Sequence, residues 1–216
     1  MDGTTNQPIN LTNKIYQGLD DECEIAMVFL DLSKAYDRIC HKRLLYKLRK
    51  LGIGGTLLQW FESYLSGRSQ RVVYGGKSSE FLNIFGSVPQ GSILSALLFL
   101  IYLNDIDENI KSDMFLFADD VDLLNKFKNK KYLEIELNSD LKQLNKWAQT
   151  WSMDFNPNKT EMVIFSNKKL KSNPNIYLKD VKINQVSEHK HLGLILSENM
   201  KWTSHIDYSI KKPEKN

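Results

Sequence analysis

Hydrophobic positions along the chain follow two different periods, one typical of helices and one typical of strands. Apolar residues recur every three or four positions in four segments, which are therefore predicted to be amphipathic helices: 9–19, 43–51, 56–67 and 132–151. Short apolar runs predict buried strands at four places: 26–32, 161–165, 176–178 and 192–196. Residues 71–74 and 81–85, separated by GGKSSE, predict a hairpin.

Two further segments complete the pattern. FLFADDVDLL, residues 115–124, predicts two short strands that meet at an acidic tip. Residues 93–103 form the longest apolar run, which is shorter than the ~18 residues that a membrane span requires. We predict a buried helix there and expect no membrane association. Helices and strands mix without regular βαβ alternation, so the predicted fold class is α+β.

Composition and charge narrow the functional classes. The chain has 216 residues, 42% hydrophobic and 25% charged, as in ordinary soluble domains. A net charge of +3 does not by itself indicate a nucleic-acid binder. Cys23 and Cys40 form neither a disulfide framework nor a zinc motif, and the first ten residues do not resemble a secretory signal. We therefore expect an intracellular protein, nuclear or cytoplasmic and not secreted.

Candidate chemistry lies at two acidic positions where apolar sequence stops. Asp31 follows AMVFL, and Asp119 and Asp120 follow FLFA. If the two strands are neighbours, each pair of carboxylates at ~4 Å repels by about 4 kcal/mol, and hard divalent cations such as Mg²⁺ relieve that repulsion. Two such ions suit phosphoryl transfer. The alternative is that Asp119-Asp120 is only a hairpin turn, because Asp is common in turns.

Five sequence blocks carry a family resemblance. FLDLSKAYDRI, SVPQGSILSALLFLIYLNDI, FLFADDVDLL, NPNKTEMVIF and HLGLIL resemble, in order and spacing, the reverse transcriptase palm of non-LTR retrotransposons, especially the jockey-like elements of animals. The resemblance covers roughly residues 9–210. It implies a polymerase palm with an antiparallel sheet backed by helices, acting as an RNA-directed DNA polymerase on an RNA template, a DNA primer and deoxynucleoside triphosphates. The implied cofactors are two Mg²⁺ ions, with Mn²⁺ as a possible substitute.

The same resemblance implies a role for individual residues. Asp31, Asp119 and Asp120 correspond to the catalytic, metal-binding triad, and the backbone carbonyl of Leu32 to a further metal ligand. Tyr36 corresponds to the aromatic residue that stacks under the incoming sugar and blocks a 2′-hydroxyl, so the product would be DNA. Simple packing is the alternative role for Tyr36.

Four further nucleotide-binding residues follow from the resemblance. Pro89, Gln90 and Gly91 correspond to the turn that contacts the incoming nucleotide and template, and Lys159 to a lysine that approaches the pyrophosphate leaving group. Two positions depart from the family pattern. Ser95-Ala96 stands where Gly-Pro is usual, and Val121 stands where Thr is common.

The resemblance also divides the chain. Residues 1–25 correspond to a remnant of the fingers and the helix leading into the palm, 26–166 to the palm, and 167–216 to palm-end strands and a stub near the thumb. With fingers and thumb largely missing, we expect weak primer-template binding and poor extension. A second hypothesis is an inactive transposon-derived fragment that retains the palm fold and binds nucleic acid weakly at most. A third is another palm polymerase, such as a maturase or a telomerase-like enzyme.

Histidines and tryptophans are assigned less directly. The four histidines have no ligand spacing, so surface or core positions are the expectation for His41, His189, His191 and His205. Trp147, Trp151 and Trp202 could be stacking platforms for bases, although the helical spacing of the first two favours a core position.

Overall fold

The computed structural model describes residues 6–89, 91–167 and 173–211. The chain forms two compact units, which are described separately. Of the described residues, the sheet unit contains 6–32, 109–145, 155–167 and 173–211, and the helical unit contains 33–89, 91–108 and 146–154. These units are defined by contacts rather than by polymerase subdomains, so the predicted boundaries after residues 25 and 166 stay predictions.

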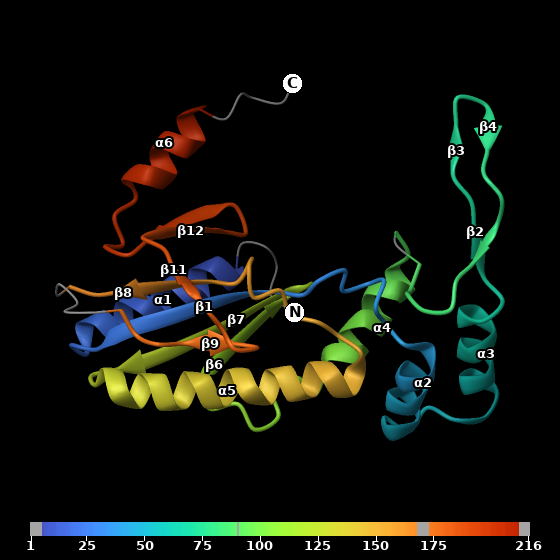
Figure 1. Cartoon of the computed structure of the whole chain (residues 1–216), viewed down its shortest axis with the longest axis horizontal. Coiled ribbons are helices and arrows are strands. Elements are labelled where there is room, and N and C mark those ends of the chain that lie inside the picture. Colours follow the sequence, from blue (N-terminus) through green and yellow to red (C-terminus); the bar gives the residue numbers. More distant parts are fainter. Residues whose placement is uncertain (1–5, 90, 168–172, 212–216) are drawn as a thin grey trace. The chain divides into compact units, whose positions relative to one another are not determined.

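A five-stranded sheet forms the centre of the sheet unit, with strand order β11-β8-β1-β7-β6 (Figure 1). The strands are β1 (Glu24–Asp31), β6 (Asp113–Phe117), β7 (Asp120–Phe127), β8 (Glu161–Phe165) and β11 (Asn184–Gln185). β1 is central because its side chains are apolar on both faces. Four strands are antiparallel as predicted, whereas the two-residue edge strand β11 runs parallel to β8.

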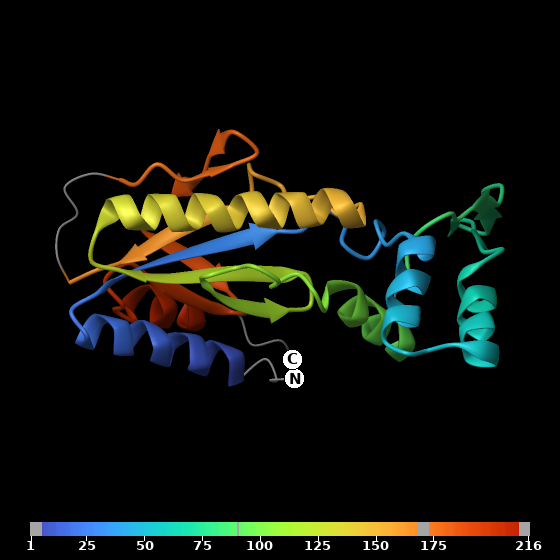
Figure 2. The ribbon, with the colours of Figure 1, turned by 90° about the horizontal axis from the view of Figure 1, so that it is seen from below.

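Helices cover both faces of this sheet (Figure 2). On one face α1 (Asn6–Asp20) packs Leu11 and Ile15 against Met27 and Phe29 of β1 in the main apolar cluster. The other face is covered by α5 (Lys130–Trp151), whose residues up to Asn145 belong to the sheet unit. Its buried positions keep the predicted spacing: Leu133, Leu137, Leu141 and Leu144.

Short hairpins follow the sheet toward the C-terminus. β9 (Tyr177–Leu178) pairs with β10 (Val181–Lys182), β12 (Glu188–His191) pairs with β13 (Leu194–Ser197), and α6 (Thr203–Lys211) follows. The strand predicted at 192–196 begins two residues later, because Leu192 and Gly193 form the turn of β12–β13 with φ of 46° and 89°.

The helical unit contains α2 (His41–Lys50), α3 (Gly55–Leu65) and α4 (Ile93–Leu103), all predicted from the sequence. Its buried Lys47 lies 2.5 Å from Asp105 Oδ1, with its ammonium 3.8 Å from the centre of the Trp151 ring. Trp147 donates from Nε1 to the same carboxylate at 2.6 Å. Trp147 and Trp151 are therefore part of a structural cluster, as their helical spacing favoured.

Two predictions for the helical unit need correction. The hairpin of residues 71–74 and 81–85 is present as a two-stranded ribbon, but its pairing is divided between two short ladders. These are β2 (Ser69–Gln70) with β5 (Leu82–Asn83), and β3 (Val73–Tyr74) with β4 (Lys77–Ser78). Second, α4 is only buried on one side, since Ile93 and Leu97 are exposed. Among the described residues, no helix has the length and apolar character needed to cross a membrane.

Candidate active site

Asp31 and Asp120 are direct cross-strand partners at one end of the sheet. Asp31 is the last residue of β1, Asp120 is the first of β7, and the antiparallel register pairs them. Directly opposed residues on one face have Cβ atoms about 5 Å apart. The predicted strand ends therefore meet, and the two carboxylates leave the same face of the sheet.

Asp119 belongs to the turn that precedes β7. Phe117 pairs with Asp120, so the connection between β6 and β7 consists of Ala118 and Asp119. Ala118 has a φ of +52°, a conformation that is uncommon for residues with a side chain. Asp119 is solvent-exposed at the tip of this turn. Asp119 thus lies in a hairpin turn, and this position is compatible with the acidic-site interpretation, which stays a prediction.

A pocket lies over this acidic strand end. Its wall includes Asp31, Asp120 and Lys159. It also includes three residues that the sequence analysis did not assign to a site: Asp122, His189 and His191. Asp120 is exposed as a residue, yet partial burial of its carboxyl in the pocket raises its pKa. Neighbouring Asp119 and, more weakly, Asp31 add to that rise, while His189 opposes it. Negative charge at this strand end is thus incompletely compensated.

Lys159 reaches the site from the loop before β8. The backbone N–H of Asn156 donates to Asp31 O at 2.9 Å, and the Asn156 side chain accepts from Asn158 N at 3.0 Å, which forms a tight local turn. Within this turn, Lys159 Nζ lies 3.9 Å from Asp31 Oδ1. Its side chain is 67% exposed, so the cation is free to approach a bound anion.

Asp122 and His191 form a buried acid–base contact behind the pocket. Asp122 lies two residues after Asp120 on the same face of β7 and is 1% exposed. Its Oδ2 lies 3.3 Å from His191 Nε2, although neither atom has a hydrogen bond of acceptable geometry with any described residue. Burial raises the pKa of Asp122 well above its ordinary value, with Asp120 adding to the rise. Burial, together with His189, lowers the pKa of His191 to about 4. His191 is thus neutral near pH 7, and Asp122 holds its proton to a higher pH than an ordinary aspartate.

His189 connects the same hairpin to the site strands. Its ring stacks on Phe29 with 3.8 Å between ring centroids, two residues before Asp31. Its Nδ1 lies 2.7 Å from Glu161 Oε2, and since a carboxylate only accepts, the ring N–H donates. β12 therefore contacts β8 and β7 through two histidine–carboxylate pairs and β1 through the stacking on Phe29. His191 is buried, as a core position requires, but the sequence analysis did not predict the contacts of His189 and His191 with these carboxylates.

The remaining predicted site residues belong to the helical unit or to the chain after β1. Leu32 is buried and forms an isolated antiparallel bridge with Phe155. Tyr36 stacks on Phe99 of α4, with ring centroids 4.4 Å apart, and its carbonyl accepts from Val88 N at 3.3 Å. Val88 precedes Pro89, and Gly91 has a φ of +86°. Gln90 lies outside the described residues. Tyr36 and the VPQGS turn are thus close together within this unit.

The donor set at the strand end suits a hard divalent cation in its chemistry. Asp31, Asp119 and Asp120 offer only carboxylate oxygens, which Mg²⁺ prefers over nitrogen or sulfur ligands. Burial and the neighbouring Asp119 raise the pKa of Asp120, and a cation shared by these carboxylates would oppose that rise. Within the described ranges, no three His, Cys, Asp or Glu side chains are arranged as a complete metal-ligand set.

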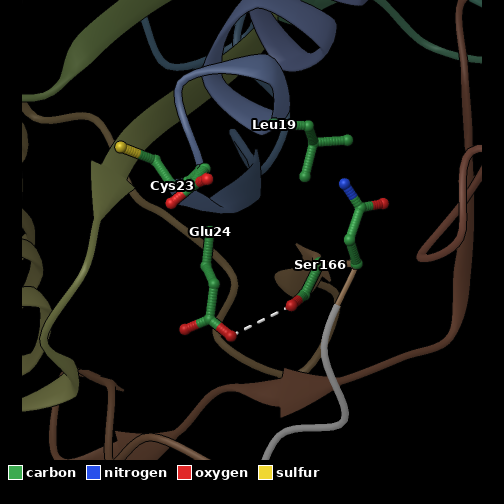
Figure 3. Close-up of a pocket in the computed structure, with 6 residues that line it drawn as sticks. Leu19, Cys23, Glu24 and Ser166 are labelled. Atoms are coloured by element: carbon green, nitrogen blue, oxygen red, sulfur yellow. Dashed lines mark hydrogen bonds between the residues drawn. The ribbon is translucent and has the colours of Figure 1, made fainter.

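A second pocket lies at the opposite end of β1 and shows a different chemistry (Figure 3). Leu19, Cys23 and Glu24 line it, and the Ser166 hydroxyl donates to Glu24 Oε1 at 3.0 Å. Glu22 also lines the pocket, but the Glu24 carboxylate already accepts a hydrogen bond, and in the part of the chain that the structure describes no group of three metal-ligating side chains forms there. The acidic end of β1 is the better candidate.

Comparison with known proteins identifies the family. Residues 7–196 match the family model described as reverse transcriptase (RNA-dependent DNA polymerase). This chain belongs to the reverse transcriptase family. It is 27% identical over 208 residues to the probable RNA-directed DNA polymerase from transposon X-element of Drosophila melanogaster, and 28% identical over 212 residues to the RNA-directed DNA polymerase from mobile element jockey of Drosophila funebris. The predicted resemblance to jockey-like retrotransposon polymerases is confirmed.

This reverse transcriptase domain covers only part of those proteins. Each of the two alignments includes 94% of this chain but 23% of the relative. Among solved structures, telomerase from Candida tropicalis in complex with a fragment of telomeric RNA has a TM-score of 0.60 over 94% of this chain and 34% of its own, at 13% identity. The apo telomerase truncated from its C-terminal domain gives 0.58 at 14% identity. At such identity the likeness concerns the fold, which confirms the predicted α+β palm.

Proposed function

We propose that this domain supplies the catalytic palm of an RNA-directed DNA polymerase, in which a primer 3′-hydroxyl attacks a deoxynucleoside triphosphate and pyrophosphate leaves. One observation carries the proposal: Asp31 and Asp120 are register partners at the end of β1 and β7, with Asp119 in the adjoining turn. The raised pKa of Asp120 supports a site that gains from added positive charge.

The sheet unit provides the groups for the reacting phosphates. Asp31, Asp119, Asp120 and the Leu32 carbonyl would hold two Mg²⁺ ions, or Mn²⁺ in their place. When bound, such ions neutralise developing charge and orient the attacking and leaving oxygens. Lys159, exposed beside Asp31, would contact the pyrophosphate as it departs.

The helical unit provides the groups for the nucleotide. Tyr36 would lie under the deoxyribose and exclude a 2′-hydroxyl, and Pro89, Gln90 and Gly91 would contact the base pair being formed. The stacking of Tyr36 on Phe99 supports this role, because a ring fixed by its neighbour is a firm steric barrier. The partners would be an RNA template, a DNA primer and deoxynucleoside triphosphates, met inside the cell in the nucleus or cytoplasm.

The decisive experiment is Mg²⁺-dependent extension of a DNA primer on an RNA template by the purified chain. We expect weak extension that Asp120→Asn abolishes. Asp113→Asn is the matched control, because Asp113 is an exposed acid on the neighbouring strand β6 and should leave extension unchanged. Equal activity in Asp120→Asn and the control would reject the assignment.

Two measurements separate the remaining alternatives. If no extension is seen, Mn²⁺ binding followed by electron paramagnetic resonance should still weaken in Asp31→Asn and Asp120→Asn, which would correspond to an inactive domain with an intact palm. If extension is seen, Tyr36→Ala should admit ribonucleotides while keeping deoxynucleotide incorporation. Unchanged sugar discrimination would return Tyr36 to a packing role.

A further inference from the structure

The two-stranded ribbon of residues 66–86 is the most exposed apolar feature of the helical unit. It extends away from the end of α3 (Figure 1). Six large side chains along it are exposed, and Tyr74 and Phe85 reach 87%: Val72, Val73, Tyr74, Phe81, Leu82 and Phe85. A lone two-stranded hairpin is only marginally stable in water, so exposed apolar side chains on both of its strands indicate a binding surface.

The ribbon has a defined conformation despite this exposure. Gly75 and Gly76 have φ of 56° and 75°, which fits the tight turn that hairpins prefer. Tyr74 pairs with Lys77 across that turn. The Arg71 guanidinium lies 4.8 Å from the centroid of the Phe81 ring, a cation–π contact between the strands. Rings and cations are thus held side by side along one short element.

Charge distinguishes the ribbon from the rest of the chain. Within residues 66–86 there are three cations, Arg68, Arg71 and Lys77, against the single anion Glu80. This segment of 21 residues therefore carries two of the three net positive charges of the whole chain. A second copy of the ribbon would be repelled by this charge, whereas a polyanion would be attracted.

We propose that the ribbon binds single-stranded nucleic acid, with bases stacked on Tyr74, Phe81 and Phe85 and phosphates facing Arg71 and Lys77. Aromatic faces combined with cations along a groove or strand are the general means by which proteins hold single strands without sequence preference. Seven residues along one extended strand of the ribbon span roughly 23 Å. That length matches about six or seven stacked nucleotides of a bound single strand. The inference rests on the proposed function, because it names a surface for the template outside the catalytic site.

The test is the affinity of the whole chain for a labelled single-stranded RNA of mixed sequence, measured by fluorescence anisotropy in EDTA. Without divalent cations, the catalytic aspartates have no role, so failure here is independent of failure in primer extension. Replacing Tyr74, Phe81 and Phe85 together by Ala should raise the Kd at least about tenfold. Tyr74→Trp should keep the affinity, because it preserves the stacking surface.

The charge part of the interaction has its own readout. Arg71→Ala combined with Lys77→Ala should reduce the slope of log affinity against log salt by about 1.4, since each phosphate contact with a single strand contributes about 0.7. Tyr132→Ala on α5 and Arg49→Ala on α2 are controls, as an exposed ring and an exposed cation elsewhere, and should change little.

Four outcomes would overturn the proposal. The first is no binding by the unmodified chain up to about 100 μM, the weak end of non-specific affinities. The second is equal loss of affinity in the ribbon variants and the controls. The third is equal affinity for an RNA duplex, whose bases are unavailable for stacking. The fourth is a dimer in sedimentation that the ribbon variants dissociate without changing RNA affinity, which would make the ribbon an interface between copies.

Discussion

Asp140 and Asp122 are both 1% exposed in the same unit, but their surroundings are opposite. Asp140 on α5 accepts from Lys111 N, Ser112 N and the Ser112 hydroxyl at 3.1, 2.9 and 2.7 Å. Asp122 faces His191 and lies on the same side of β7 as Asp120, and among the described residues its Oδ2 has no hydrogen-bond partner. Buried polar groups are normally satisfied, so the fully bonded acid is structural, whereas the unsatisfied one lies beside the candidate site.

Asp140→Asn should have the largest effect on the free energy of unfolding. The amide group would place a donor against the backbone donors that now point at a carboxylate, so we expect the free energy of unfolding to fall by about 4 kcal/mol. Urea denaturation measures this. Asp207→Asn on α6 is an exposed control with no expected effect. A loss similar to that of the control would mean that the three bonds contribute little.

The pH dependence of His191 gives the next largest effect. Its pKa falls from 6.5 to about 4 on folding, so the unfolded chain binds a proton first as the pH drops. The stability that this lowered pKa contributes is fully present above pH 6.5 and is lost between pH 6.5 and 4. The total loss is about 3 kcal/mol. His191→Phe should remove this acid-side loss, and urea denaturation at several pH values tests it. His205→Phe, at a partly exposed position, should keep the loss.

Asp122→Asn should change the free energy of unfolding in the opposite direction to Asp140→Asn. The pKa of Asp122 is raised in the folded state, so between its ordinary value and the folded value the unfolded chain has already released the proton. Stability conferred by the native acid is therefore lost as pH rises above about 4, and the amide avoids that loss. At pH 7 we expect the variant to be more stable than the native chain, and at pH 3 we expect equal stability. Destabilisation at pH 7 would show that the Asp122–His191 contact is structural.

The smallest change in the free energy of unfolding is expected for an exposed ion pair. Lys14 Nζ lies 2.8 Å from Asp113 Oδ2, and both side chains are at least one third exposed. Solvent screens such pairs, so Asp113→Asn should change the free energy of unfolding by less than about 0.5 kcal/mol. A larger change would mean that proximity of charges alone, without burial, determines stability in this unit.

The sequence predicted the sheet and its acidic end because the evidence for them is local. The run before Asp31 is too apolar for an edge strand, and FLFADD contains both strands and their turn within a few residues. Pairing of Asp31 with Asp120 then follows from placing two buried strands side by side. The evidence for α5 was equally local, because apolar residues recur at helical spacing on one side over five turns.

Contacts between distant segments could not be predicted in the same way. His191 follows Asp122 by 69 positions, and their meeting depends on how β12–β13 returns to the sheet. Asp122 itself had a signal, because it lies two residues after Asp120 and side chains alternate along a strand. The divided ladders of the ribbon and the two-residue strand β11 are too short for any periodic pattern. The roles assigned to Tyr36, Gln90 and Lys159 stay predictions.

Because of the register of β1 against β7, the site depends on whether an odd or an even number of residues is deleted from β1. Side chains on neighbouring positions of a strand face opposite sides of the sheet, so deletion of one residue between Phe29 and Asp31 would turn the Asp31 carboxylate toward α5. Removal of two residues from β1 before Asp31 would return the Asp31 carboxylate to its original face and would shift the pairing with β7 by two residues. Length variation among descendants of this domain should therefore be excluded from the end of β1 and tolerated in the loops around it.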